Sequence, residues 1–492
     1  MTKAWTAFTD WIGTLSDLSG TLSLMGWDRE TLMPPGGADG RARHMGTLST
    51  LHHRELVRPD MAGVLDEVAN DDGLDAAQRR QVELAMRHRS KAERLPESLV
   101  RDLSEATSRS VNVWIETRNT GDYPAYAQAL AEVVRLKRAA AALLSDGGEP
   151  YDALLDDFEP GAHAASLEPI FDELVAAIPP LVDDAASRAP APLPGRTWPA
   201  EAQLALGHDL AEMIGYDLGR GFIGRSAHPV TMTIGRGDVR FTTRIDTGNP
   251  LINIGTVMHE AGHALYEQGF PADAWRSPLQ DAPSMGAHES QSRFWENHIG
   301  RRPQFWARIE PMLRARFPEA MADLDVGRFA DAAVDVRPSL IRTEADEVTY
   351  NLHIALRFTL ELGLVRGDLE VEALPSEWRR LTTELLGLQP EHDGQGVMQD
   401  IHWAEGLFGY FPTYTLGNLY AAQLAEAADR DLGGLDAAIA AGRFADILSF
   451  MRTRVHVHAN LRPTDELMRD ATGAPLETRP LIDHLTRVVA GE

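Results

Sequence analysis

Cysteine is absent from the 492 residues of the chain. Disulfides, thiolate metal sites, Fe–S clusters and a cysteine nucleophile are therefore excluded, and any metal ion must be bound by His, Asp or Glu. Basic residues are also few, because 47 Lys+Arg stand against 73 Asp+Glu and the formal net charge is −26. Nucleic acid and an anionic membrane surface are not expected as partners, since both require basic patches.

Long apolar runs are missing as well. No stretch of 18 apolar residues occurs, so no transmembrane helix is expected. Polar residues interrupt the first ten positions, which lack the continuous apolar segment of a secretory signal. We therefore expect a cytoplasmic protein.

Helical periodicity dominates what is present. Apolar residues recur every three or four positions over residues 76–146, and again from about residue 340 to 489, so the fold is predicted to be mainly α. Four prolines at positions 190, 192, 194 and 199 mark a linker, because such density is incompatible with a helix interior. We expect a single catalytic domain, residues 1–492, with an N-terminal helical lobe at about 1–190 and a metal-binding lobe at about 200–492.

In one segment the residue types alternate along the chain with a period of two, as in a β-strand, instead of following the helical period. Residues 230–234 and 238–245 are rich in β-branched residues and flank a Gly-Arg-Gly turn, which predicts a β-hairpin. A single hairpin is marginally stable, so it should pack on the helices that follow.

The motif His259-Glu260-Ala-Gly-His263 follows this hairpin. Asn249 before a proline is a suitable helix N-cap and Gly269 a suitable C′ residue, so the motif is predicted to lie on a helix. There the two histidines, at i and i+4, project from one face and can bind one ion. Glu260 would flank the ion as general base for a metal-bound water. The alternative is an amphipathic helix whose histidines merely pair with carboxylates.

A catalytic metal of this kind needs a third protein ligand. Glu289 lies 289 − 263 = 26 residues past the second histidine, which leaves room for a loop and a returning helix. Spacing alone allows Glu289 or Glu296 and does not exclude His288 or His298. A di-iron centre would need two Glu-x-x-His motifs, but among the 17 His only His263 has a Glu three residues earlier.

Several ordered motifs together resemble the thermostable carboxypeptidases of the carboxypeptidase Taq type, which are single-zinc metallocarboxypeptidases. The resemblance covers most of the chain, from residue 27 to about 420. The matching segments are the N-terminal Trp27–Gly37, Asp238-Val-Arg240-Phe-Thr242 (D-x-R-x-T), the H-E-x-x-H at 259–263, His288-Glu-Ser-Gln291 (H-E-S-Q), Ile341-Arg-Thr-Glu-Ala-Asp346 (I-R-x-x-A-D) and Gly396-Val-Met-Gln-Asp-Ile-His-Trp403 (G-x-x-Q-D-x-H-W).

The resemblance implies a zinc ion held by His259, His263 and Glu289, with Glu260 as general base and later proton donor. It implies the two-lobed helical groove of angiotensin-converting enzyme and neurolysin, with a small sheet beside the zinc helix. It also implies a homodimer that releases single C-terminal residues from peptides with a free C-terminus, with broad specificity, and in which cobalt can replace zinc.

Two further groups of residues are expected to act on the substrate. His402, Tyr410 and Tyr414 are suitable donors for the oxyanion, although each tyrosine could equally be a buried structural residue. Arg342 is expected to bind the substrate carboxylate, the alternative being an intrahelical pair with Asp346.

Strand 238–245 is expected to pair with the extended substrate, as edge strands do. Asp238 and Arg240 on this strand would then contact the substrate, or could simply pin the hairpin.

The leading hypothesis is thus a zinc metallocarboxypeptidase. An oligopeptidase or dipeptidyl carboxypeptidase on the same fold is the alternative enzyme, and would differ in product length. A non-catalytic helical zinc-binding protein is the alternative of another class, against which the intact Glu260 argues.

Overall fold

The computed structural model describes residues 2–186 and 193–491. This part of the chain forms twenty α-helices and one three-stranded sheet, which confirms the mainly α prediction. None of the described helices is both long enough and apolar enough to span a bilayer. Pro190 and Pro192 lie outside the described residues, and the division into two lobes stays a prediction.

Nine helices form the described part of the first half of the chain, and the fourth to sixth of them cover the range 76–146 that was predicted to be helical. They are α1 (Lys3–Thr31), α2 (Ala38–Leu56), α3 (Met61–Ala69), α4 (Ala76–Arg94), α5 (Glu97–Thr117), α6 (Tyr123–Leu144), α7 (Pro150–Leu155), α8 (Ala164–Ala186) and α9 (Ala200–Ile214). Those of the second half are α10 (Pro250–Gln268), α11 (Met285–Arg293), α12 (Pro303–Arg316), α13 (Gly327–Ala333), α14 (Tyr350–Arg366), α15 (Leu374–Leu386), α16 (Pro412–Leu432), α17 (Leu435–Ala440), α18 (Phe444–Arg454), α19 (Thr464–Thr472) and α20 (Arg479–Ala490).

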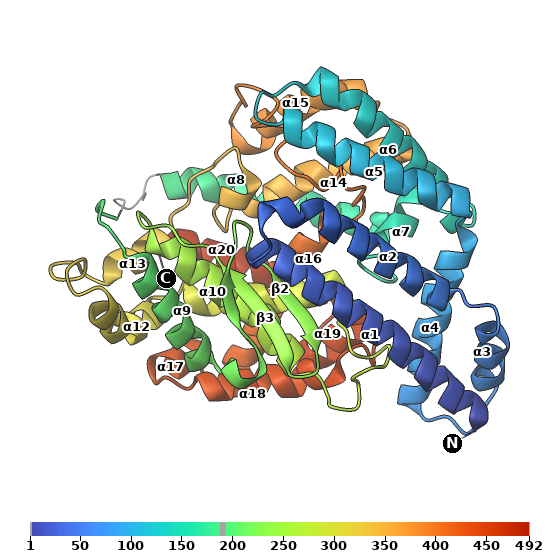
Figure 1. Ribbon diagram of the computed structural model, residues 1–492. Coiled ribbons are helices and arrows are strands. Elements are labelled where there is room, and N and C mark those ends of the chain that lie inside the picture. The colour runs from blue at the N-terminus through green and yellow to red at the C-terminus, as the bar shows by residue number, and fades with distance from the viewer. Residues whose placement is uncertain (1, 187–192, 492) are drawn as a thin grey trace.

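Apolar side chains form one large core and a smaller N-terminal one. The smaller core joins α1, α3 and α4 through residues such as Phe8, Trp11 and Leu65. The large core runs from Ala106 to Val489, so α5–α8 share it with the C-terminal helices. In Figure 1, α16 lies near the centre of the molecule and α1 runs beside the sheet.

The predicted hairpin is confirmed as β2 (Thr231–Gly235) and β3 (Asp238–Thr243), which pair antiparallel. A short strand not predicted from the sequence, β1 (Ile223–Arg225), pairs parallel to β3 and gives the order β1-β3-β2. β3 is therefore the central strand, paired with β2 on one side and, over its last three residues, with β1 on the other. The prediction that strand 238–245 adds to the substrate backbone as an edge strand is wrong, since β3 lies between two strands and ends at Thr243.

Helix α10 begins as predicted but ends differently. The side chain of Asn249 accepts a hydrogen bond from the backbone N–H of Leu251 at 3.1 Å, as an N-cap should. Gly269 ends the helix with φ −86°, so it does not form a left-handed C-cap. A Cβ at this position would lie 2.5 Å from Nδ1 of His456, and glycine is needed here because of this close approach.

Residues 339–346, predicted to be helical, form only a 3-10 turn at Arg342–Glu344. The carboxylate of Asp346 accepts hydrogen bonds from the backbone N–H groups of Val348 and Thr349, both at 2.9 Å. These bonds fix a turn ahead of α14 and prevent a continuous helix.

Candidate metal centre

Three predicted ligands come together between α10 and α11. Nε2 of His263 lies 3.3 Å from Oε2 of Glu289, and Nε2 of His259 lies 3.7 Å from the same oxygen. One donor atom from each residue lies within 4.8 Å of the others. This His-His-Glu set matches the donors of a catalytic zinc site with an open position.

Close packing of the two helices makes this geometry possible. A Cβ on Gly262 would lie 2.6 Å from the carbonyl oxygen of Gln291, so only glycine lets α10 approach α11 here. Ser284 caps α11 by accepting the N–H of Ala287 at 3.1 Å. Because of this packing, Glu289 faces the two histidines.

Glu296 approaches His259 from the side opposite the shared donor atoms. Its Oε2 lies 2.8 Å from Nδ1 of His259, while Nε2 of the same ring faces Glu289. Burial disfavours the ionised form of Glu296, but Arg293 at 3.1 Å holds its pKa well below the usual range. A carboxylate on Nδ1 orients the ring and leaves Nε2 available for a metal.

The two histidines that spacing could not exclude lie elsewhere. Nε2 of His288 is 2.8 Å from a carboxylate oxygen of Glu267, and its ring stacks on His263 at 4.3 Å. His298 packs against His484 at 4.2 Å. Neither joins the cluster of donor atoms.

Glu260 lies buried on α10 and is contacted by the sheet. The hydroxyl of Thr231, on β2, donates a hydrogen bond to Oε2 of Glu260 at 2.7 Å. Burial raises the pKa of Glu260, whereas the charge of His259 and the hydroxyl of Thr231 oppose this shift. The predicted hairpin thus supplies a direct partner for the predicted general base.

The three predicted oxyanion donors cluster together. Nε2 of His402 lies 3.2 Å from Oη of Tyr414, and the Tyr410 ring lies 5.4 Å from both the His402 and the Tyr414 ring. Burial lowers the pKa of His402 to about 4, so its imidazole is neutral near pH 7. His402 and Tyr414 line a cavity of about 970 Å³ together with His259 and Glu289.

Arg342 lines the same cavity and is almost fully buried. Its guanidinium donates to Oδ1 of Asp400 at 2.8 and 3.0 Å and to Oη of Tyr350 at 3.1 Å. Asp400 also pairs with Arg357, at 2.5 Å. The alternative of an intrahelical pair with Asp346 is wrong, because no helix forms around Arg342.

Asp238 and Arg240 form a bidentate ion pair on β3, with both distances 2.7 Å. The guanidinium of Arg240 lies 5.7 Å from the centre of the Trp27 ring on α1. This geometry fits the alternative that the pair pins the hairpin. Neither residue lines the cavity that contains His259, and a role in substrate binding stays a prediction.

Several contacting residues were missed by the sequence reasoning. Arg293 had a readable signal, because it follows Glu289 by four residues and pairs with it at 2.7 Å. Asp400 belongs to the motif around His402, so its charge could have been matched with Arg342. Thr231 and Tyr350 gave no local signal.

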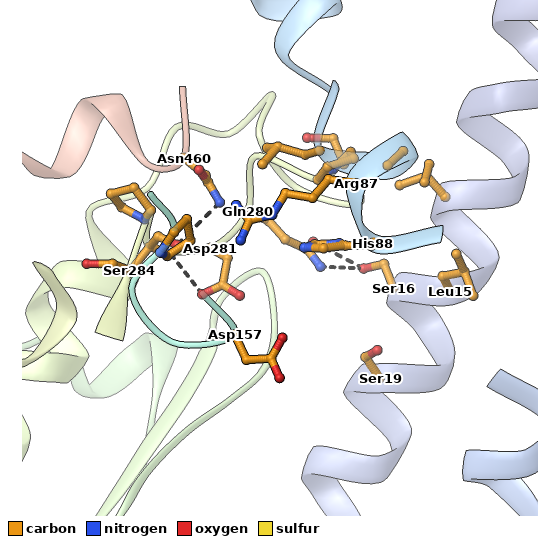
Figure 2. Close-up of a pocket in the computed structure, with 18 of the residues that line it drawn as sticks. Leu15, Ser16, Ser19, Arg87, His88, Asp157, Gln280, Asp281, Ser284 and Asn460 are labelled. Atoms are coloured by element: carbon orange, nitrogen blue, oxygen red, sulfur yellow. Dashed lines mark hydrogen bonds between the residues drawn. The ribbon is translucent and has the colours of Figure 1, made fainter. Parts of the chain in front are cut away.

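A second cavity, of about 630 Å³, lies between α1, α4 and the loop before α11. Figure 2 shows Ser16 and Gln280 hydrogen-bonded across it, at 2.9 and 3.1 Å, and Asp281 pointing into it. Arg87 and Lys91 on α4 both pair with Asp156. Of the candidate site residues only His288, a ligand that spacing had left open, lines this cavity.

Comparison with known proteins identifies the family. Residues 7–489 match the family described as carboxypeptidase Taq (M32) metallopeptidase. The chain is 40% identical over 485 residues to thermostable carboxypeptidase 1 of Thermus thermophilus, covering 95% of this chain and 94% of that protein. It is 35% identical over 462 residues to thermostable carboxypeptidase 1 of Pyrococcus furiosus, covering 92% of each.

The fold agrees with this family. The crystal structure of the M32 carboxypeptidase from Deinococcus radiodurans superposes with a TM-score of 0.97, at 35% identity and with 100% of both chains covered. The resemblance noted in the sequence, the fold class and the assignment to the peptide hydrolases are confirmed. The chain belongs to the carboxypeptidase Taq (M32) family of metallopeptidases.

Proposed function

We propose that this metallocarboxypeptidase uses a zinc ion to release single C-terminal amino acids, with broad specificity, from peptides whose C-terminus is free. The observation that carries the proposal is the cluster of His259, His263 and Glu289, two of which, His259 and Glu289, line the same cavity as Arg342. His-His-Glu is a donor set of catalytic zinc, and cobalt is expected to replace zinc. Arg342 offers a planar guanidinium for a carboxylate.

In this proposal His259, His263 and Glu289 hold the ion. When bound, zinc polarises the scissile carbonyl and lowers the pKa of water to about 7. Glu260 takes the proton of the attacking water and returns it to the leaving amine. His402, Tyr410 and Tyr414 are the candidate donors to the oxyanion, and Arg342 orients the C-terminal carboxylate.

The pH dependence should report on Glu260 and Thr231. The Thr231 hydroxyl donates to the ionised carboxylate and lowers its pKa, so Thr231→Val is expected to raise the pKa of Glu260. A general base works above its pKa, and the acid limb of kcat/KM should therefore move to higher pH. Thr233→Val is a matched control on the same strand, because the Thr233 hydroxyl has no hydrogen-bond partner in the described structure. A limb that stays in place, or moves to lower pH, in Thr231→Val would contradict this role.

Recognition of the free C-terminus should depend on Arg342. Arg342→Lys is expected to lower kcat/KM for unblocked peptides by about 10–100-fold, since a bidentate charged contact is reduced to a point charge. The slow cleavage of C-terminally amidated peptides should not change. Equal losses on both peptide classes would show that Arg342 supports the site without binding the carboxylate.

Mass spectrometry of products tests the function itself. Unblocked and amidated versions of the same peptides are incubated with the protein, with and without a chelator. We expect stepwise loss of single residues from unblocked peptides only, and none with chelator. Dipeptide or internal products that ignore amidation would favour an oligopeptidase, and absence of cleavage with one metal bound would favour a binding protein.

A homodimer and a cytoplasmic location complete the proposal. Both rest on expectations from the sequence, and the dimer is implied by the family resemblance. Sedimentation of the purified protein tests the dimer directly.

A further inference from the structure

The loop between α15 and α16 carries two of the candidate oxyanion donors. It has no α-helix between residues 387 and 411, yet His402 and Tyr410 both lie on it. The backbone hydrogen bonds of the loop lie mostly within its own turns and few reach regular elements, so side-chain contacts to other elements hold the loop in place. Asp400 makes such contacts with Arg342 and Arg357, ahead of His402.

Glu361 of α14 lies under this loop and is completely buried. Its Oε1 accepts the indole N–H of Trp403 at 2.8 Å, and its Oε2 accepts the backbone N–H of Gly409 at 3.1 Å. Oε2 also accepts the hydroxyl of Tyr151, on α7, at 2.9 Å. Trp403 follows His402 and Gly409 precedes Tyr410, so one carboxylate binds the residue next to each donor.

The position is costly for a carboxylate. Among the described residues none forms an ion pair with Glu361, and the charge that acts on it is that of Lys137, which is itself largely buried. Burial raises the pKa of Glu361 to about 7, against the effect of its three hydrogen bonds. A hydrophobic residue would avoid this desolvation cost, so the carboxylate needs another explanation.

A carboxyl group satisfies all three partners whether it is ionised or protonated, and an amide cannot. Trp403 and Gly409 present N–H groups, which cannot accept a hydrogen bond, whereas the Tyr151 hydroxyl can turn to accept one from the protonated acid. In the isosteric glutamine the amide nitrogen must face either Trp403 or Gly409, and that bond is lost. Glu361 is thus suited to fixing the loop beside His402 and beside Tyr410 at once.

We propose that Glu361 is a positioning residue for the reaction, whose buried carboxylate anchors Trp403 and Gly409 and so holds His402 and Tyr410 against the metal centre. The anchor itself follows from the hydrogen bonds, and its catalytic consequence rests on the function proposed above. Glu361 touches no reacting atom and acts only through this loop.

The test compares Glu361→Gln with Tyr151→Phe. Tyr151→Phe removes the partner outside the loop and keeps both loop bonds, so it is the matched control. Hydrogen exchange of peptides covering residues 401–411 measures whether Glu361 holds the loop in place, and this measurement does not require enzyme activity. We expect exchange there to rise about tenfold in Glu361→Gln, with the rest of the protein unchanged, and to rise less than about threefold in Tyr151→Phe.

Steady-state kinetics measure how the loss of the loop contacts affects catalysis. In Glu361→Gln we expect kcat to fall about 10–100-fold with KM within about threefold and with one metal still bound, because oxyanion donors act in the transition state. A phosphonate peptide, which mimics that state, should bind more weakly by the same factor.

Each other result overturns part of the proposal. Unchanged exchange in Glu361→Gln would refute the anchor. Raised exchange with a wild-type kcat, or a loss expressed in KM or in metal content, would refute the positioning of the donors. If the wild-type protein releases no C-terminal residue the proposed function fails, while the exchange data still test the anchor.

Should Glu361→Gln not fold, Trp403→Phe deletes one loop donor and keeps the carboxylate. Raised exchange around residue 402 with a lower kcat is then expected. Unchanged exchange and kcat would refute the anchor.

Discussion

Glu260→Gln is expected to lower kcat by about 10³-fold while leaving KM and the bound metal almost unchanged. The amide cannot take a proton from water, and a positioned general base contributes about 10²–10⁴-fold to such reactions. A loss of 10³-fold corresponds to about 4 kcal/mol of transition-state stabilisation. Steady-state kinetics on an unblocked peptide, with metal content measured on the same samples, gives both quantities.

Glu267→Gln is the control for this substitution. Glu267 lies on the same helix, seven residues further on, and pairs with His288 at 2.8 Å. We expect its kcat to stay within about fivefold of wild type. Comparable losses in both variants, or a normal kcat in Glu260→Gln, would contradict the role of Glu260 as the base.

Glu289→Gln should abolish activity by a different route, through loss of the metal. Oε2 of Glu289 lies 3.3 Å from Nε2 of His263 and 3.7 Å from Nε2 of His259, so one oxygen faces both histidines. Removing one of three protein ligands is expected to weaken metal binding by more than about 100-fold. Titration against a chelator of known affinity measures this change.

Glu296→Gln tests whether Glu296 is itself a metal ligand or a residue that orients the ligand His259. Glu296 contacts the far nitrogen of His259, and changes at such positions cost about 10–100-fold in metal affinity. We therefore expect a smaller loss than in Glu289→Gln. The reverse order would make Glu296 the third ligand and would refute the assignment.

Local chemistry made α10 and the hairpin predictable. Asn249 before Pro250 is a cap that can be read from two neighbouring residues, and the alternation around Gly235-Arg-Gly237 needs only the turn and the strand period. The facing of His259 and His263 follows from helical spacing alone. These features depend on short stretches of sequence, and the structure contains all of them.

Spacing could not distinguish Glu289 from Glu296, because seven residues separate them and a continuous α-helix would present both on one face. The chain instead changes to a π-helix at Phe294–Gly300, which shifts the register. Glu296 then meets Nδ1 of His259, while Glu289 meets Nε2.

Long-range pairing explains the remaining errors. The pair of Arg342 with Asp400 joins residues 58 positions apart, and its sequence signal lies in the motif around His402 and not in the run around Arg342. Likewise β1 occupies an edge of β3 that the hairpin pattern left open. Gly269 is required by His456, on a segment that packs against the end of α10 only in the folded chain.

Crystals of Glu260→Gln with zinc and an unblocked peptide would test the central claim most directly, by anomalous diffraction at the zinc edge. We predict one peak per chain, within bonding distance of His259, His263 and Glu289, with the last peptide bond over the ion and the terminal carboxylate at Arg342. A peak bound by Glu296 in place of Glu289, or a peptide whose C-terminus lies away from Arg342, would contradict the account.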